Sequence, residues 1–174
     1  RLVPFKGHRY LVEAIAGVVR NTRQVLCVLV GDGELMPSLQ EQTRALGIEE
    51  SVKFLGFQDN LHEIYPAFDV YCHSSLELEA EAFPLAILRA LATGLPVVTT
   101  RVGGIGAMVQ EGVSGFLTQQ EDTPALANAL LQVVSSGPLR DRLGKASFEL
   151  FVRSFHASAM AERMEQIYAT TMQR

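Results

Sequence analysis

Residues 81–100 read EAFPLAILRALATGLPVVTT, in which an acid opens an apolar helix and a glycine stop leads into a buried strand. Pro84 near the start and Gly94 at the end match the usual asymmetry of helix termini. The first-turn N–H groups of a helix lack internal partners, and the aligned peptide dipoles place roughly half a positive charge at that end. Anionic groups bind at such ends, so the stretch predicts a phosphate-binding junction between a helix and a strand.

Helices and strands alternate along the rest of the chain. Apolar residues at positions 11, 14, 15, 18 and 19 have helical spacing and predict one face of a helix over residues 7–21. The uniformly apolar run Val25–Val30 predicts a parallel strand covered on both faces. The same patterns predict further helices at 34–46, 61–65, 82–93, 105–110, 122–135, 138–152 and 156–172, and strands at 52–55, 69–72, 96–100 and 116–117. This alternation predicts an α/β fold, a Rossmann-like three-layer arrangement around a parallel sheet, which binds ligands at the carboxyl ends of its strands.

The composition is that of an ordinary soluble domain. The chain has 174 residues, of which 48% are hydrophobic and 20% charged, with a net charge of −4. This length suits one domain with a substantial core. The charge lacks the basic surplus that favours nucleic-acid or acidic-membrane binding, and the apolar runs are far shorter than the roughly 20 residues that span a bilayer. We therefore expect neither a nucleic-acid partner nor a transmembrane helix.

The cysteines, the histidines and the first residue support the same class. Cys27 and Cys72 lie in apolar strand-like runs and are expected to be structural thiols, compatible with a reducing cytoplasm. No metal site is expected, because no metal-ligand spacing joins the four histidines, His8, His62, His73 and His156. The chain opens with Arg1 directly on a motif, without the layout of a signal peptide, so we expect an upstream part to be missing.

Five motifs follow one another in the order and spacing of a known enzyme family. They are RLVPFKG at residues 1–7, VGDGEL at 30–35, FLGF at 54–57, the stretch at 81–100 with VGGI after it, and EGVSGFL at 111–117. Together they resemble the nucleotide-sugar half of the family-4 retaining glycosyltransferases. That family carries Glu-(seven residues)-Glu, then Gly-x-Pro-Val-Val and Gly-Gly-Ile-Pro-Glu. One short match is weak evidence, whereas five in order identify the chain as a member.

The resemblance implies the C-terminal half of a GT-B fold, in which residues 1–174 form a nucleotide-sugar-binding domain and the N-terminal acceptor-binding domain is missing. Such enzymes transfer a sugar from a UDP, GDP or ADP sugar with retention of configuration, usually without a metal. A retaining hexosyltransferase acting on a cell-envelope polysaccharide or glycolipid is therefore implied. The enzyme is expected in the cytoplasm, and its missing domain is expected to bind an acceptor at the inner face of the membrane. The isolated chain is expected to bind its donor weakly and to transfer nothing.

The resemblance also assigns the site. It implies that Arg1 and Lys6 bind the departing diphosphate, Arg1 through two parallel N–H groups and Lys6 through a compact charge. Gly7 is expected to let the backbone approach the donor closely. Glu81 takes the catalytic role, in contact with donor-sugar hydroxyls, and Phe57 faces the base. The other donor-binding residues follow Glu81 on the predicted helix: Ala82, Phe83, Pro84, Leu85 and Arg89.

Simpler interpretations stand beside these assignments. The two cations are also typical of solvated surfaces, and Glu81 is also typical of a helix start, where a carboxylate gains only about 0.3–1 kcal/mol from the dipole. Phe57 also fits the end of a strand in the core. Asp32 and His8 are expected to serve in a turn and at a helix start.

Arg89 is the main departure from the family pattern. The family's second Glu, which accepts hydrogen bonds from ribose hydroxyls, belongs at this position, and a guanidinium has no acceptor. Nearby, Ala82 and Pro84 replace frequent glycines, and Gly106 and Ala107 replace a common Pro-Glu pair. These changes leave three alternatives open: an unusual donor, a divergent site that still transfers sugar, or lost catalysis. For Arg89 itself the alternatives are contact with the donor, exposure to solvent, or pairing with an acid such as Glu111.

Two rival classes also remain. One is a non-catalytic domain derived from the same fold. It is favoured by Arg89 and Ala107 and disfavoured by the retained Arg1, Lys6 and Glu81. The other is a sugar-nucleotide epimerase, which shares the two-domain architecture but carries a different acidic and histidine pattern. The last helix is predicted to cross toward the missing domain and to leave an apolar patch exposed, formed by Phe155, Met160, Met164, Ile167 and Tyr168.

Overall fold

The computed structural model describes residues 1–22, 24–77 and 83–172. Its strands are β1 (Cys27–Val30), β2 (Val52–Gly56), β3 (Tyr71–His73), β4 (Val97–Thr100) and β5 (Gly115–Thr118). Its α-helices are α1 (His8–Val19), α2 (Met36–Ala45), α3 (Leu61–Ile64), α4 (Leu85–Ala92), α5 (Thr123–Val134), α6 (Gly137–Ser154) and α7 (Ala157–Thr171). Short 3-10 helices cover Pro4–Lys6 (η1), Glu49–Ser51 (η2), Tyr65–Ala67 (η3) and Gly103–Ala107 (η4).

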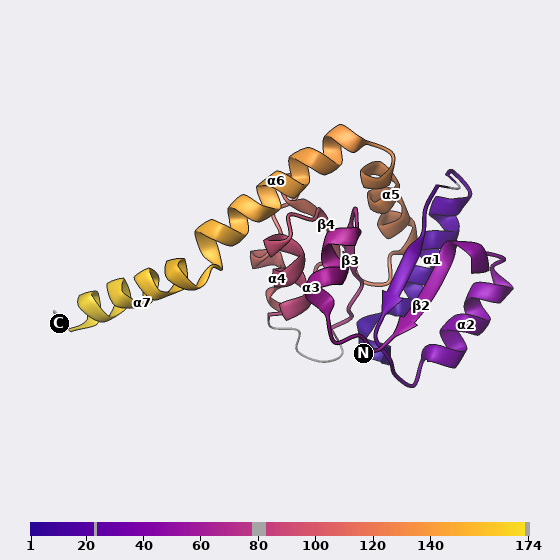
Figure 1. The fold of residues 1–174 in the computed structure, drawn as a ribbon, viewed down its shortest axis with the longest axis horizontal. Helices are drawn as coiled ribbons and strands as arrows, with labels where there is room; N and C mark the ends of the chain where they lie inside the picture. Colours follow the sequence, from indigo (N-terminus) through magenta and orange to yellow (C-terminus); the bar gives the residue numbers. More distant parts are fainter. Residues whose placement is uncertain (23, 78–82, 173–174) are drawn as a thin grey trace.

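Every strand pair in the described part of the chain is parallel, as the alternation of helices and strands predicted. The strands form two hydrogen-bonded groups, β1–β2 and β3–β4–β5, and Figure 1 shows them at the centre with helices around them. In the larger group, Val98 of β4 lies between Cys72 of β3 and Phe116 of β5. Leu29 of β1 packs in the same apolar cluster as Val98, so both groups share one core.

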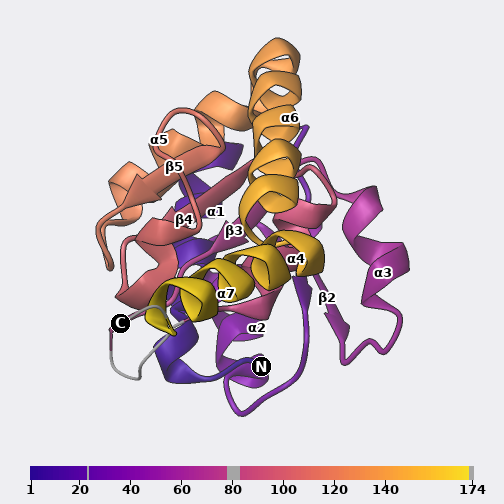
Figure 2. The same cartoon turned by 90° about the vertical axis from the view of Figure 1, so that its left-hand side faces the viewer.

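The layers follow from the alternation of side chains along β4, the only described strand that is buried throughout. Val98 packs in a cluster with α1 and α5, which contribute residues such as Val12 and Leu130. Its neighbour Val97 points to the opposite face, into a cluster with Ile87 and other residues of α4 and η4. The sheet is thus covered on both faces (Figure 2), which confirms the predicted three-layer α/β architecture.

Three sequence-based boundaries were wrong for identifiable reasons. The strand predicted over Val25–Val30 begins at Cys27, and only Leu29 in it is buried, because Leu26 precedes the first β1–β2 pair and is 56% exposed. The helix predicted from residue 82 begins at Leu85. A residue before proline avoids the helical region, so Phe83 stays outside the helix and Pro84 becomes its N-cap. The region predicted as a helix at 105–110 forms η4 instead.

The C-terminal helix α7 projects beyond the end of α6 and away from the sheets (Figure 1). No described residue of α7 is buried, and the predicted exposed apolar face is confirmed at Met160, Met164, Ile167 and Tyr168. Phe155 does not belong to this face. It caps α6, and its ring meets the edge of Phe83 at 5.5 Å. Within residues 1–22, 24–77 and 83–172, no helix combines the length and the apolarity needed to cross a membrane.

The N-terminal segment is an integral part of the fold. The Leu2 N–H donates to the Asp32 carbonyl at 2.8 Å, and the Leu35 N–H donates to the Leu2 carbonyl at 3.1 Å. On the other side, the Leu76 N–H donates to the Phe5 carbonyl at 2.7 Å. The segment therefore bridges the loops that follow β1 and β3, and Figure 1 shows the N-terminus beside the arrowheads of β1 and β2.

We expect Gly7→Ala to destabilise the protein far more than Gly47→Ala. Both glycines have left-handed backbones, with φ of 63° and 66°, so each substitution incurs a conformational cost of about 1–2 kcal/mol. A Cβ on Gly7 also falls 2.0 Å from the Ser74 carbonyl oxygen, whereas a Cβ on Gly47 meets nothing within 4 Å. Urea unfolding should give a loss of about 3–5 kcal/mol for Gly7→Ala. Equal losses in the two variants would contradict this account of the close approach.

Candidate functional site

The candidate site lies at the carboxyl ends of the parallel strands, where such sheets bind ligands. Residues 1–7 cross the loops after β1 and β3, and α4 is the next helix after β3 in the chain. The Ser74 hydroxyl donates to the Lys6 carbonyl at 3.0 Å, which ties the motif to the end of β3. Elements distant in sequence thus meet at one edge of the sheet.

Two cations stand together at this edge. The Arg1 guanidinium carbon and the Lys6 Nζ lie 5.9 and 5.2 Å from the centre of the Phe5 ring. Burial, and then the charge of Arg1, lower the pKa of Lys6. Both causes disfavour the charged lysine, and an anion bound between the two side chains relieves the repulsion. The structure therefore brings together the two cations that the sequence assigned to a diphosphate.

α4 follows β3 in the chain, so its N-terminal end lies on the carboxyl side of the parallel strands. Pro84 is buried as the N-cap, while Leu85 is 67% exposed at the first helical position. The Ile87 N–H donates to the Pro84 carbonyl at 3.0 Å, and the N–H groups before it belong to the first turn, where a helix offers N–H groups without intrahelical partners. Phe83 is 45% exposed and packs on Phe155. Glu81 and Ala82 lie outside the described residues.

Phe57 follows β2 and is 72% exposed, which excludes the alternative of a core residue at the strand end. It comes directly after Gly56, whose left-handed backbone ends the strand and whose carbonyl accepts from the Gly31 N–H at 2.8 Å. Asp32 is the predicted turn residue, because its carboxylate accepts from the Gly33 N–H at 2.7 Å. An exposed aromatic ring at this edge offers a flat apolar surface to a base.

Arg89 is exposed on α4, one helical turn beyond Leu85. Its charge acts on the Tyr65 hydroxyl, whose pKa is raised by burial and lowered to a smaller extent by Arg89. The Glu111 carboxylate accepts from the Leu117 N–H at 2.7 Å. Arg89 thus stands on the face of α4 that turns toward η3.

His73 at this edge went unrecognised in the sequence, whereas His8 begins α1 as predicted. His73 is 7% exposed, and its ring nitrogens lie 3.2 Å from the Tyr71 hydroxyl and 2.9 Å from the Ser75 hydroxyl. Burial, then Lys6 and His8, lower the pKa of His73 to about 3. Burial also lowers the pKa of His8 to about 4, and its buried Nδ1 has no hydrogen-bond partner among the described residues. The only available signal for His73 was its position at a strand end before two serines.

The cysteines behave as expected for structural thiols. Cys27 and Cys72 are free and lie in β1 and β3. Burial raises the pKa of both thiols, that of Cys27 to about 12. A protonated thiol is a poor nucleophile, so neither cysteine contributes chemistry to this site.

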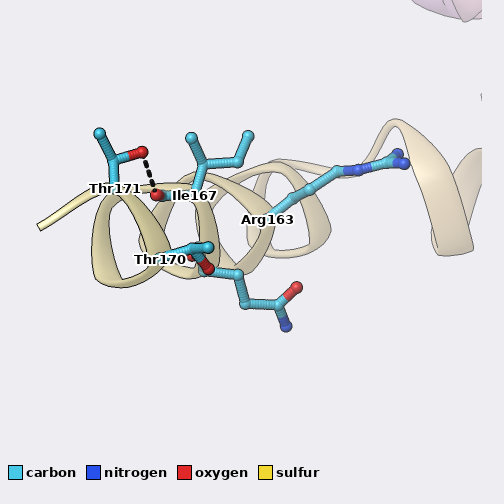
Figure 3. A pocket seen from close by; sticks show the side chains of 5 residues that line it. Arg163, Ile167, Thr170 and Thr171 are labelled. Carbon is cyan, nitrogen blue, oxygen red and sulfur yellow. Dashed lines mark hydrogen bonds between the residues drawn. The ribbon is translucent and has the colours of Figure 1, made fainter. Parts of the chain in front are cut away.

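A separate depression lies along α7, away from these groups (Figure 3). Its walls come from a single helix, and the Thr171 hydroxyl in it donates to the Ile167 carbonyl at 2.8 Å. One helix surface cannot enclose a ligand, so we place the functional site at the strand ends.

The parallel sheet, its two helical layers and its similarity to solved structures define the C-terminal half of a glycosyltransferase with a GT-B fold. The chain belongs to the family of glycosyl transferases group 1, whose model matches residues 1–150. The predicted family and fold are therefore confirmed.

Two curated relatives illustrate the family. N-acetyl-alpha-D-glucosaminyl L-malate synthase of Bacillus anthracis is 34% identical over 158 residues, which cover 91% of this chain and 40% of the relative. The lipopolysaccharide core biosynthesis glycosyltransferase LpsE of Rhizobium meliloti is 32% identical over 98% of this chain and 48% of its own length. The chain thus spans less than half the length of these relatives.

Two solved structures match the fold. Anabaena HepE in complex with UDP superposes with a TM-score of 0.87 and 28% identity, over 98% of this chain and 47% of HepE. The C-terminal domain of LpcC, a group 1 family protein from Francisella tularensis, gives a TM-score of 0.81 at 21% identity, over 90% of this chain and 83% of that domain. The second similarity concerns the fold alone.

The two buried histidines predict a loss of stability in mild acid. Their folded pKa values of about 4 and 3 lie below the usual value of 6.5, so below about pH 6.5 the unfolded chain binds more protons than the folded chain. Their contribution is complete above pH 6.5 and is lost as the pH falls, by at most about 1.4 kcal/mol per pH unit for each.

Urea unfolding at about pH 7, 6 and 5 measures this dependence. We expect a shallower decline for His8→Gln, which removes one titrating group. His62→Gln is the control, because the His62 side chain is 80% exposed, and it should keep the slope of the unmodified chain. An unchanged slope in His8→Gln would contradict the prediction.

Proposed function

We propose that this chain is the donor-binding domain of a retaining glycosyltransferase that transfers a hexose from a nucleotide sugar to a glycan or glycolipid. The carrying observation is that Arg1 and Lys6 both lie over the Phe5 ring, and that Ser74, directly after β3 and before α4, holds the Lys6 carbonyl. Negative charge develops on the departing diphosphate in such a reaction, and fixed positive groups there lower the barrier. The likeness to HepE, which was solved with UDP, favours UDP over GDP or ADP.

Each proposed contact rests on chemistry that its position allows. Arg1 and Lys6 bind the diphosphate through charge-assisted hydrogen bonds, and the N–H of Leu85 adds a donor at the helix start. The exposed Phe57 ring packs on the base. Glu81 contacts the hydroxyls of the donor sugar, as the family resemblance implies. The remaining residues of the proposed donor site are Gly7, Ala82, Phe83, Pro84 and Arg89.

The rest of the enzyme completes the proposal. Residues 1–174 form the donor domain, and a separate N-terminal domain supplies the acceptor site, in keeping with relatives about twice as long. The exposed apolar face of α7 packs against that domain. The enzyme acts in the cytoplasm, with its acceptor at the inner face of a membrane, in cell-envelope polysaccharide or glycolipid assembly. A non-catalytic domain remains the second candidate because Arg89 replaces the family's ribose acceptor.

Lys6→Met should weaken the binding of UDP by about 10–100-fold, because it removes a charge-assisted hydrogen bond and keeps an aliphatic stem over Phe5. Lys53→Met is the matched control, since Lys53 is exposed on β2 outside the candidate site. Calorimetry or NMR titration of the chain with UDP, GDP and ADP gives the affinities. If none of the three binds the unmodified chain more tightly than about 1 mM, near −4 kcal/mol, the donor-binding proposal fails.

Arg89 requires its own test. A guanidinium donates but does not accept, so we expect Arg89 to contact a phosphate oxygen or a base carbonyl rather than to accept from the ribose. Arg89→Ala should then weaken nucleoside diphosphate binding about three- to tenfold, and Arg89→Glu should weaken it further. The opposite pattern, tighter binding in Arg89→Glu with no change in Arg89→Ala, would identify a lost ribose contact and exclude recognition of the donor by Arg89.

A further inference from the structure

A network of buried polar side chains lies next to the segment that carries Lys6 and has no part in the proposed contacts with the donor. At its centre is His73, 7% exposed at the end of β3. Its Nδ1 lies 3.2 Å from the Tyr71 hydroxyl and its Nε2 lies 2.9 Å from the Ser75 hydroxyl. The His73 carbonyl accepts from the Thr99 hydroxyl at 2.9 Å. Both ring nitrogens and the backbone of this residue are therefore held.

The ring is neutral at pH 7, since its pKa lies at about 3. A neutral imidazole has one donor and one acceptor, so the hydroxyls of Tyr71 and Ser75 must take opposite hydrogen-bonding roles. Such a directional arrangement tolerates little change in the position of either neighbour, because a buried polar group that loses its partner is costly.

One end of this network reaches the segment that carries Lys6. Ser74 and Leu76, on either side of Ser75, hold that segment through its backbone. The Ser74 hydroxyl donates to the Lys6 carbonyl at 3.0 Å, and the Leu76 N–H donates to the Phe5 carbonyl at 2.7 Å. The conformation around Ser75 thus decides where the Lys6 side chain starts.

The other end reaches α4. The Tyr71 ring stacks on the Tyr65 ring, with centroids 5.7 Å apart and planes 24° apart. Tyr65 is 7% exposed, and its hydroxyl donates to the carbonyl of Ala86 at 3.2 Å. Ala86 lies in the first turn of α4.

We propose that His73 is a positioning residue, which through Ser75 on one side and the Tyr71–Tyr65 stack on the other sets the spacing between the Lys6 segment and the first turn of α4. The inference rests on the proposed donor binding and adds a cause for its geometry. A diphosphate is held best when the cation and the helix start converge on it at a fixed separation, and a displacement of either one weakens the contact. His73 itself touches no donor atom.

The test compares UDP with UMP, because two phosphates can engage both elements and one phosphate engages fewer of their groups. Calorimetry with the 174-residue chain measures both affinities for His73→Phe, Tyr65→Phe and the double variant. Tyr65→Phe keeps the ring stack and removes the hydroxyl that bonds Ala86 and Tyr71. We expect each single variant to weaken UDP binding about tenfold and UMP binding about twofold. The double variant should weaken binding little more than the stronger single variant does, because the two residues act in the same network.

Two further variants separate positioning from general destabilisation. His73→Gln offers one donor and one acceptor to the same hydroxyls and should recover most of the UDP affinity. Thr43→Val removes a buried hydrogen bond of 2.7 Å to Leu39 within α2, away from β3. It should lower the free energy of unfolding and leave the UDP affinity unchanged.

The outcomes are distinguishable. If the unmodified chain binds none of UDP, GDP and ADP, the proposed function fails and the role of His73 fails with it. If the unmodified chain binds UDP and folded His73→Phe binds it equally well, only the role of His73 is overturned. That role is also overturned if UDP and UMP binding weaken by equal factors, or if Thr43→Val weakens UDP binding as much. Should His73→Phe not fold, Tyr65→Phe decides by the same comparison.

Discussion

The structure depends on the seating of residues 1–7 across the ends of β1 and β3. The contact is close enough that a Cβ on Gly7 would lie 2.0 Å from the Ser74 carbonyl oxygen, so only glycine fits there. The same seating buries Leu2 completely in the core and brings Lys6 to the carboxyl edge of the sheet. One packing constraint therefore serves both stability and the position of the cations, which is why the segment belongs to the fold and not to a flexible end.

The electrostatics of the site are local. The chain as a whole carries a net charge of −4, yet Arg1 and Lys6 stand together at the carboxyl edge of its sheet. Burial keeps His8 and His73 neutral close to these groups, which avoids further positive charge in a poorly solvated place. At the proposed site an anion would meet both cations at short range, so its recognition would require no basic surface elsewhere on the molecule.

Sequence reasoning succeeded where a pattern is local or where motifs come in order. The periodicity at residues 8–19, the buried strand β4 and the glycines that end helices predicted the parallel three-layer fold. It failed where a neighbour in space or in sequence overrides the pattern. Leu26 is apolar but precedes the first strand pair, and Pro84 delays the start of α4. Phe155 has the spacing of the last helix but packs on Phe83.

By itself the sequence determined the family, the order of the elements and the set of cations at strand ends, because motif spacing and periodicity are properties of neighbouring residues. Only the tertiary structure decided which distant groups meet. The ring of His73 bonds the hydroxyls of Tyr71 and Ser75, and the network around it joins residue 6 to residue 86. Such contacts depend on the packing of strands and helices against one another, and no local pattern encodes that packing.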